Sequence, residues 1–477
     1  IESGGNYNTV VGDEAGTAIT TGDQNVAVGY AAGLAVTTGV QNTLIGAEAG
    51  DAMTTAMLNV AVGYQALSAD TTGRKSVGIG YSALGVQNVT DASDVFNVAI
   101  GHNAGGAVTT GVQNTLIGGL TGDAMTTGNR NTALGYSALS SDTLGDRNVA
   151  IGNLALQTQN FTSSTDSYNT AVGYNAGALA TTGIQNTLIG ALAGDALTDS
   201  DKNVAVGYAA LTAEVLGQFN VAIGRSALQA QSNGSAVDVY NTAVGYNAGA
   251  VVTTGVSNTL IGGLVGDAIT TGSNNVALGR SALTATTTAS DNTAVGFAAL
   301  AANTTAANNT AVGRDALTLN TTGSENTAIG ANALDATDDG AGCVAVGYSA
   351  LSANCGSSNT AVGSSAGLVV TGQNNTLIGN AAALGLTSGS NNLVLGKDAG
   401  RSGTPGGNIT SQSNIISLGD QNIVTANIQV DWTVASDARD KTDFTALDLG
   451  LDFVKALAPV TYKWDKRSKY GDKSAED

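Results

Sequence analysis

The sequence Asn25-Val-Ala-Val-Gly29 recurs with small changes through most of the chain, as in Asn42-Thr-Leu-Ile-Gly46 and Asn114-Thr-Leu-Ile-Gly118. The motif occurs twenty-three times, and seventeen of the twenty-two intervals between copies are 17 residues, three are 21 and two are 16. Such regularity indicates one small structural unit that is stacked many times. The copies begin at residues 8, 25, 42, 59, 76, 97, 114, 131, 148, 169, 186, 203, 220, 241, 258, 275, 292, 309, 326, 343, 359, 375 and 392.

Each unit is predicted to form one coil of two short strands and two turns. β-Branched and aliphatic residues at the second and fourth positions are typical of a strand, whereas Thr-Thr-Gly and Asn mark turns. Stacked coils place their strands in parallel about 4.8 Å apart, so twenty-three coils span on the order of 110 Å. Helices are disfavoured because glycines interrupt every coil. The predicted fold class is all-β, an elongated parallel β-roll or β-helix.

Three positions of the unit are nearly fixed, and each has a physical reason. Gly at the fifth position predicts a positive φ or a close approach to a neighbouring backbone. Ala at the eighth position predicts a narrow interior. Asn at the first position, in all units except those of Ser76 and Cys343, predicts side-chain amides that stack between coils or cap their own backbone. We expect Cys343 and Cys355 to be free thiols in small buried positions, with a disulfide or metal ligation as the alternative.

A longer rhythm of 72 residues overlies the unit. The ninth position runs Gly, Gly, Leu, Leu in successive units, and 21-residue intervals end the sets of four. We interpret the acids that keep this spacing as a solvated surface row. They are Asp51, Asp123, Asp195 and Asp267.

The three four-residue insertions supply candidate ligand-binding residues. Each insertion places an acid and an aromatic residue in an equivalent loop, and such pairs are used in sugar recognition. The alternative is that the aromatic rings fill a seam between chains. The pairs are Asp94 with Phe96, Asp166 with Tyr168, and Asp238 with Tyr240.

Composition and charge exclude several classes of function. The formal net charge is −19, and residues 1–400 hold 9 Lys and Arg against 26 Asp and Glu. An acidic body disfavours nucleic acid and anionic membranes, and no apolar run is long enough to insert in a membrane. We predict no cofactor and no metal site, because His102 is the only histidine and no phosphate-binding loop is present.

The repeated unit resembles the head repeats of trimeric autotransporter adhesins and similar repeats of bacteriophage tail fibres. The resemblance covers roughly residues 8–400, although the unit here is longer than the adhesin unit. In that family the coils form a left-handed parallel β-roll, three chains pack side by side, and the head recognises a host surface. The resemblance therefore implies a homotrimer and a host-binding role.

The chain after residue 400 differs in composition. We divide it into a linker with irregular strands at 401–435 and a small α+β module at 436–477, which follows the shaft at 1–400. Ser436-Asp437-Ala-Arg439-Asp-Lys441, with Pro459-Val460 and Tyr462-Lys-Trp464 downstream, resembles the start of the self-cleaving intramolecular chaperone of endosialidases and phage tail spikes.

This second resemblance implies a single self-cleavage and no multi-turnover activity. Ser436 corresponds to the nucleophile that attacks the Ala435–Ser436 bond, and Lys441 to the group that activates it. A desolvated Lys has a lowered pKa and can accept the hydroxyl proton. Asp437 and Arg439 would support this pair. The alternative reading is that Ser436 and Asp437 cap the following segment and the charges are a solvated face.

Together the two resemblances predict a trimeric bacteriophage tail fibre or tail spike that binds a host-cell glycan or protein. Other tail proteins would join it through a missing N-terminus, and its location would be the virion tail. One alternative is a bacterial trimeric surface adhesin on the cell surface. Another is a polysaccharide depolymerase, although acidic pairs such as Asp338 and Asp339 lie in short turns and not in an expected cleft.

Overall fold

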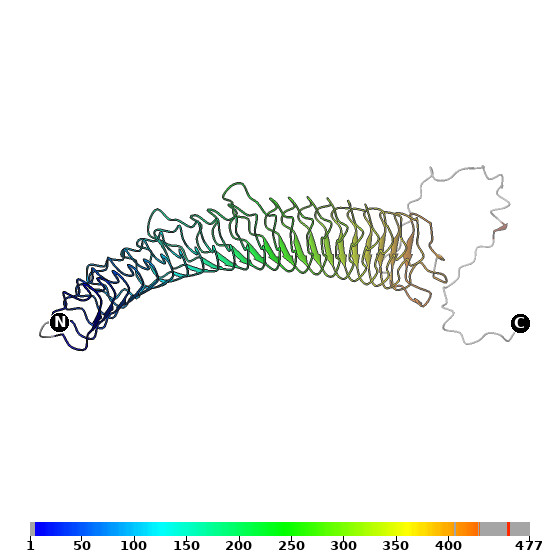
Figure 1. The fold of residues 1–477 in the computed structure, drawn as a ribbon. Coiled ribbons are helices and arrows are strands. Elements are labelled where there is room, and N and C mark those ends of the chain that lie inside the picture. Colours follow the sequence, from blue (N-terminus) through cyan, green and yellow to red (C-terminus); the bar gives the residue numbers. More distant parts are fainter. Residues whose placement is uncertain (1–4, 405–406, 428, 430–455, 458–477) are drawn as a thin grey trace. The chain divides into compact units, whose positions relative to one another are not determined.

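The computed structural model describes residues 5–404, 407–427, 429 and 456–457. It divides into two compact units, Ile1–Ile423 and Val424–Asp477. The first unit is an all-β parallel solenoid of about 23 coils, and its strands lie in a row along one side of a rod (Figure 1). The predicted all-β solenoid is therefore confirmed. The predicted α+β module lies outside the described residues.

Twenty-three strands of three residues each occupy the second to fourth positions of the repeated unit. They are β1 (Thr9–Val11), β2 (Val26–Val28), β3 (Thr43–Ile45), β4 (Val60–Val62), β5 (Val77–Ile79), β6 (Val98–Ile100), β7 (Thr115–Ile117), β8 (Thr132–Leu134), β10 (Val149–Ile151), β12 (Thr170–Val172), β13 (Thr187–Ile189), β14 (Val204–Val206), β15 (Val221–Ile223), β16 (Thr242–Val244), β17 (Thr259–Ile261), β18 (Val276–Leu278), β19 (Thr293–Val295), β20 (Thr310–Val312), β21 (Thr327–Ile329), β22 (Val344–Val346), β23 (Thr360–Val362), β24 (Thr376–Ile378) and β25 (Leu393–Leu395).

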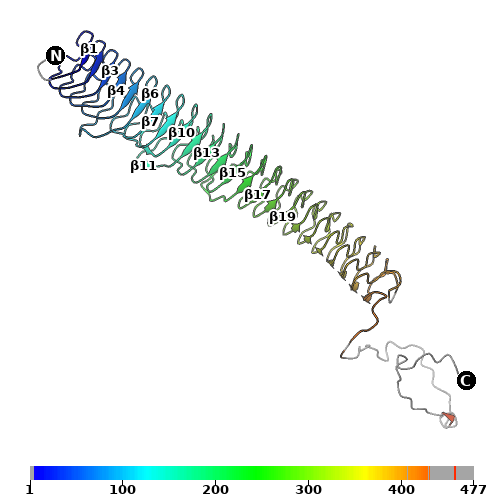
Figure 2. The ribbon, with the colours of Figure 1, turned by 90° about the horizontal axis from the view of Figure 1, so that it is seen from below.

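These strands form one parallel sheet in which each strand pairs with the next at the same register, as Leu188 of β13 pairs with Ala205 of β14. Figure 2 shows the strands in their order along the rod. The sheet continues past residue 400 into β26 (Ile416–Leu418), which pairs with β25. A separate two-stranded ladder joins β9 (Gly145–Asp146) to β11 (Thr165–Asp166) beside one insertion.

The prediction of two strands per coil is wrong, because the structure has one strand per regular coil. The backbone of the remaining residues repeatedly enters the left-handed region, as at Gln65 (φ 53°), Leu67 (φ 51°) and Lys75 (φ 61°). Residues with such φ values cannot continue a strand. Coil-to-coil hydrogen bonds nevertheless persist there, and the N–H of Leu67 donates to the carbonyl of Ala83 at 3.0 Å.

The fixed Gly and Asn positions are explained by contacts between coils. Gly29 has φ 137°, and a Cβ there would lie 2.5 Å from the carbonyl oxygen of Gly46, so both predicted reasons for glycine apply. Asn42 donates its backbone N–H and its side-chain Nδ2 to Oδ1 of Asn25, each at 3.0 Å. The predicted stacking of amides between coils is therefore confirmed. These ladders are buried and supply partners for polar groups at the corner of the coil.

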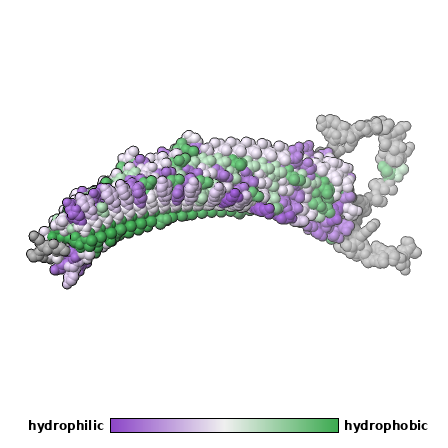
Figure 3. All heavy atoms as spheres, in the orientation of Figure 1, coloured by the Kyte–Doolittle hydropathy of each residue, from purple (hydrophilic) through white to green (hydrophobic). Residues whose placement is uncertain are grey.

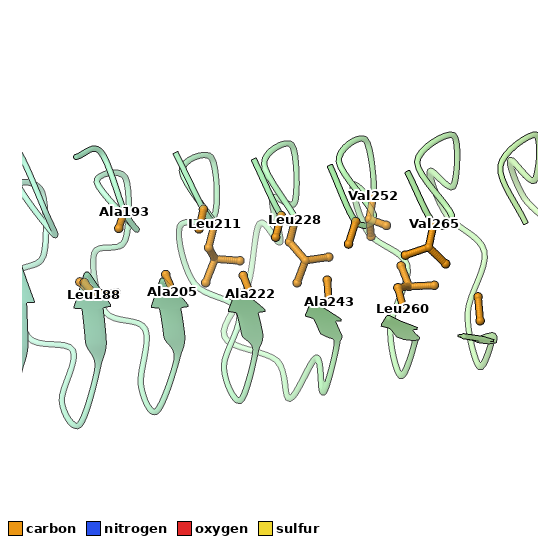
Figure 4. Close-up of a cluster of buried hydrophobic side chains, with 14 of the residues drawn as sticks. Leu188, Ala193, Ala205, Leu211, Ala222, Leu228, Ala243, Val252, Leu260 and Val265 are labelled. Carbon is orange, nitrogen blue, oxygen red and sulfur yellow. The ribbon is translucent and has the colours of Figure 1, made fainter. Parts of the chain in front are cut away.

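The choice of Gly or Leu at the ninth position depends on the size of the strand side chain that points into the interior (Figure 4). Where the strand carries Leu188, the ninth positions are Gly177 and Gly194, and a Cβ on either would lie 2.7 or 2.8 Å from a Leu188 methyl. Where neighbouring strands carry alanine, Leu211 and Leu228 fill the space from the opposite side. Large and small side chains therefore alternate to fill a narrow interior.

Candidate functional site

The outer face of the sheet carries an uncovered band of aliphatic side chains. In β17, Leu260 is fully buried while its neighbour Ile261 is 37% exposed, because successive strand residues point to opposite faces. The same alternation repeats in every coil, and Figure 3 shows the resulting hydrophobic band along the rod. We call these side chains the apolar stripe. Its exposed members include Val11, Ile45, Ile100, Leu134, Ile189, Ile223, Ile261, Leu278, Val312, Ile329, Val362 and Ile378.

One edge of this face is a row of aromatic and cationic side chains that follow the fixed Gly, which we call the Gly-side row. Its tyrosines are between 42% and 58% exposed. Tyr64 stacks on Tyr81 with ring centroids 5.4 Å apart, and Arg225 lies over the rings of Tyr208 and Tyr246. The sequence analysis missed this row, although eight of the thirteen tyrosines occupy it. They are Tyr30, Tyr64, Tyr81, Tyr136, Tyr174, Tyr208, Tyr246 and Tyr348.

The opposite edge is the row of residues that precede the Asn of each unit, which we call the Asn-side row. Each of these residues has a left-handed backbone, as Phe96 does with φ 55°, and long side chains here point outward. The aromatic members of the predicted ligand-binding pairs lie in this row. Phe96, Tyr168 and Tyr240 are 47%, 50% and 53% exposed.

Two of the predicted acid and aromatic pairs are joined by a cation from the preceding coil. Lys75 Nζ lies 2.7 Å from the Asp94 carboxylate and 5.0 Å from the centre of the Phe96 ring. Arg147 forms the equivalent ion pair with Asp166 and lies 5.5 Å from the Tyr168 ring. Each cluster therefore neutralises its own acid.

The third pair has no cation at the equivalent position, where Phe219 stands instead. The Phe219 ring stacks on Tyr240 with centroids 5.2 Å apart, and Lys202 lies 4.8 Å from the Phe219 ring. The Tyr240 hydroxyl donates to the Asp238 carboxylate at 3.0 Å, which raises the pKa of Tyr240. The structure thus brings all three predicted pairs together, and ligand binding by them stays a prediction.

Beneath each insertion lies a buried chain of hydrogen bonds that the sequence analysis missed. Asn169 Nδ2 donates to Oε1 of Gln159 at 2.8 Å, and Gln159 Nε2 donates to Oδ2 of Asp142 at 2.7 Å. The other carboxylate oxygen of Asp142 accepts the N–H of Gly145 at 3.0 Å. Burial raises the pKa of Asp142. These side chains are fully buried, so the network closes the interior where four extra residues leave the coil.

The same chain occurs under the other two insertions. Gln87 Nε2 donates to Asp70 at 2.7 Å, and Gln231 Nε2 donates to Glu214 at 2.8 Å. The signal in the sequence was the 72-residue spacing of Asp70, Asp142 and Glu214. Figure 1 shows loops that rise from the side of the rod opposite the strands, in its cyan and green parts.

The four aligned acids are only partly exposed, and their interpretation as a solvated row is wrong for Asp51 and Asp123. Oδ1 of Asp51 and Oδ1 of Asp123 are buried without a hydrogen-bond partner. Burial raises the pKa of both carboxyls. Asp267 accepts a hydrogen bond from the Thr284 hydroxyl at 2.6 Å, and Asp195 accepts one from Thr212. The turns that carry these acids pack against the adjacent coils more closely than their polar sequence suggests.

Cys343 and Cys355 are free and buried, as predicted, and their Sγ atoms lie 3.9 Å apart. A hydrogen bond from Cys355 lowers the pKa of Cys343 to about 7, and the pKa of Cys355 is raised by the same contact. Cys343 takes the place of an Asn, and its backbone N–H still donates to Asn326 Oδ1 at 2.8 Å. The main-chain bond to the preceding coil is therefore kept where the thiol replaces the amide.

Within the described ranges, no group of three or more His, Cys, Asp or Glu side chains is placed to hold a metal ion. That part of the chain also contains no helix with the length and apolar character needed to cross a membrane. Two hollows, of about 260 and 420 Å³, lie near the last coils. The first is lined by Asp398, Arg401 and Asp420, among other polar residues.

The predicted cleavage residues Ser436, Asp437, Arg439 and Lys441 lie outside the described residues. Residues 436–476 match the model of a family described as the chaperone of endosialidase. The match begins at the predicted nucleophile, Ser436. No curated protein matches the chain. The chain therefore combines a parallel β-solenoid with a C-terminal segment similar to that chaperone family.

Proposed function

We propose that the protein is the trimeric shaft of a bacteriophage tail fibre or tail spike, which carries a C-terminal chaperone that is released by self-cleavage. The observation that carries this proposal is the order of the two parts: a β-solenoid is followed by a segment similar to the chaperone of endosialidase. The solenoid is a rigid scaffold of repeated coils. Its backbone is the same in each regular coil, whereas the side chains of the Gly-side row and the Asn-side row vary from coil to coil. Such a scaffold suits attachment better than catalysis.

The apolar stripe supports association of three chains. The exposed aliphatic side chains of the stripe run from Val11 to Ile378, far longer than the scattered apolar residues of a monomer surface. Three identical chains can bury this band around one axis and leave no copy uncovered. A chaperone that assembles the chains would prevent the stripes from associating out of register.

The cleavage chemistry needs few groups. The hydroxyl oxygen of Ser436 would attack the carbonyl carbon of Ala435 while Lys441 accepts the hydroxyl proton. The Ala435–Ser436 C–N bond would then break, the amine of Ser436 would take a proton, and water would hydrolyse the resulting ester. Asp437 and Arg439 would orient these groups. The reaction happens once per chain because the nucleophile leaves with the released segment.

Cleavage can be tested by denaturing mass spectrometry of the product of the complete gene. The Ser436→Ala and Lys441→Ala variants are expected to remain uncut, whereas Thr442→Ala, which changes a nearby hydroxyl outside the motif, is expected to be cut normally. A normally cut Ser436→Ala product would refute the assignment of the nucleophile. An uncut wild-type product would remove the cleavage mechanism.

We further propose that the rod joins other tail proteins in the virion and binds a glycan or protein on the host cell. The three clusters around Phe96, Tyr168 and Tyr240 are the candidate contact points, because each exposes an aromatic face beside fixed charges. Purified rod should bind host cells and compete with whole phage for them. Equal competition by a rod with all three aromatic residues changed to Ser would exclude these clusters as the contact.

A further inference from the structure

The two edges of the sheet face carry side chains that complement each other at the same coil. The Asn-side row holds four cations, Lys75, Arg130, Arg147 and Lys202. The Gly-side residue of the same coil is a tyrosine for Lys75, Arg130 and Lys202, and Asn153 for Arg147. Those tyrosines, Tyr81, Tyr136 and Tyr208, are 51%, 55% and 51% exposed. A cation over an exposed aromatic ring is a favourable pair. One coil reverses the order, with Phe219 on the Asn side and Arg225 on the Gly side.

Side-chain size is complementary in several coils, whereas the coils of Tyr168 and Tyr240 also have a tyrosine in the Gly-side row, Tyr174 and Tyr246. Once in each of the first four sets of coils, the Gly-side row has a very small residue, and the Asn-side residue of that coil is Gln or Ser. A fifth coil reverses this order, because Gly342 on the Asn side is matched by Tyr348 on the Gly side. The pairs are Gln41 with Ala47, Gln113 with Gly119, Gln185 with Ala191, and Ser257 with Gly263.

The charges do not oppose such a contact. Across the described coils, no coil carries a charge in both rows, so no like charges would face each other at the same level. Asp291, an acid of the Asn-side row, lies at the level between the coils of Arg280 and Arg314 in the Gly-side row. Like charges that face each other would destabilise a contact, so their absence from every coil is what an interface requires.

Within one chain the two members of a pair cannot touch. Five residues of strand and turn separate them, and six extended steps along the chain span about 20 Å. The complementarity therefore has to serve a contact between chains. In a three-fold assembly around an axis parallel to the rod, the strands run head to tail around the axis, so the end of one strand meets the start of the next chain's strand at the same height.

We propose that the chains of the rod pair in register, coil against equal coil, with the Asn-side row of one chain seated on the Gly-side row of the next. Lys75, Arg130 and Lys202 then lie over tyrosines of the neighbouring copy, and the small Gly-side residues receive Gln or Ser side chains. This inference rests on the proposed trimer and adds its register and its contacting edges. Phe96, Tyr168 and Tyr240 lie in the same Asn-side row, so in the assembled rod these rings would fill the seam between chains, which is the alternative to host binding by them. The apolar stripe lies between the two rows, so it faces the axis.

Cross-linking tests the register directly. In the full chain with Cys343→Ala and Cys355→Ala, the pair Arg130→Cys and Tyr136→Cys is treated with a short bismaleimide. We expect most of the chain to migrate as covalent trimer on a denaturing gel. The matched control, Arg130→Cys with Tyr208→Cys, places the thiols four coils or about 19 Å apart along the rod and should stay monomeric.

A size-swap experiment gives an independent test. Ala191→Tyr introduces a side chain that this position of the unit accepts in many coils, so the single chain should fold, but the ring would collide with Gln185 of the neighbouring copy. We expect a lower temperature of trimer dissociation, which Gln185→Ala restores and Gln113→Ala, four coils away, does not. Unchanged dissociation of Ala191→Tyr would overturn the pairing.

Native mass separates the two levels of the proposal. If the wild-type protein is monomeric, the trimer itself is refuted. If it is a trimer that cross-links only in the control pair, or in neither pair, the in-register pairing is refuted while the trimer stands. Cross-linking in the Arg130 and Tyr136 pair alone supports both.

Discussion

Three sets of coils carry an insertion and the fourth does not, and their interiors differ at the same position of the unit. Under the insertions the inward side chains are Asp70 with Gln87, Asp142 with Gln159, and Glu214 with Gln231. In the set without an insertion they are Thr286 and Asn303, and the Thr286 hydroxyl donates to the Asn303 carbonyl at 3.0 Å. The insertion and the buried acid therefore occur together.

This difference shows how the buried hydrogen bonds of the interior change where an insertion is present. In a regular coil the Asn amide donates to the Asn of the coil before it, as Asn292 does to Asn275. Where four residues are added, Asn169 Nδ2 donates instead to Gln159, which in turn donates to Asp142. Such a chain of donors needs an acceptor at its end, and a carboxylate supplies two acceptor oxygens and no donor.

Removal of the middle member is expected to have the largest effect. Gln159→Leu would leave both the Asp142 carboxylate and the Asn169 amide short of one buried partner, at a cost of about 3–5 kcal/mol to local stability. Hydrogen exchange of peptides from residues 140–170 measures this. The control Asn303→Leu should cost less, because the Ala306 carbonyl that it serves also accepts from Asn292 at 3.0 Å. Equal costs would remove the distinction between the two kinds of coil.

A change of the terminal acceptor to an isosteric amide is expected to have an intermediate effect. In Asp142→Asn, either the Gln159 amide or the Gly145 N–H loses its acceptor whichever way the new amide is turned. The expected cost is about 1–3 kcal/mol by the same exchange measurement. The Asp166→Asn variant, at an exposed acid of the same insertion, is the control and should be nearly neutral.

The pH dependence sharpens this prediction. Because burial raises the pKa of Asp142 above its unfolded value near 4, its contribution to stability is full below that pH and is lost as the pH rises through the folded pKa. The stability difference between wild type and Asp142→Asn should therefore narrow as the pH rises from about 4. A difference that widens over this range would show that the carboxylate is stabilised in its ionised form.

The smallest effect is expected at the surface of the insertion. Asp166→Ala removes the ion pair with Arg147. The Asp166 side chain is 48% exposed and the Arg147 side chain 33% exposed, and exposed ion pairs contribute about 0.2–1 kcal/mol to stability. Exchange in the insertion should change little, and Arg147 should remain over Tyr168. A loss as large as that of Gln159→Leu would mean that the exposed pair holds the insertion and the buried chain does not.

The repeated part of the fold could be predicted from sequence because each rule is applied many times. Glycine and asparagine recur at the positions of the unit that Gly29 and Asn42 occupy. The close backbone approach at the glycine and the hydrogen bonds of the asparagine could therefore be predicted from the pattern alone. The number of strands per coil could not be predicted, because the left-handed backbone occurs at non-glycine residues such as Gln65 and Leu67. Only packing between coils stabilises that conformation, and no local propensity signals it.

Candidate surfaces were harder to predict, because a surface role depends on which positions share a face. The acid and aromatic pairs were visible as insertions, but their cations, Lys75 and Arg147, come from the preceding coil. The tyrosines of the Gly-side row look like ordinary variation until the solenoid aligns them. Ser436 and Lys441 belong to a motif that occurs once, so its identification rests on similarity and not on repetition.

The most direct test of the account is the native and denatured mass of the product of the complete gene. We predict a native trimer whose subunits end at Ala435 on denaturation, since assembly precedes release of the chaperone. An uncut monomer would contradict both the trimeric shaft and the self-cleaving segment.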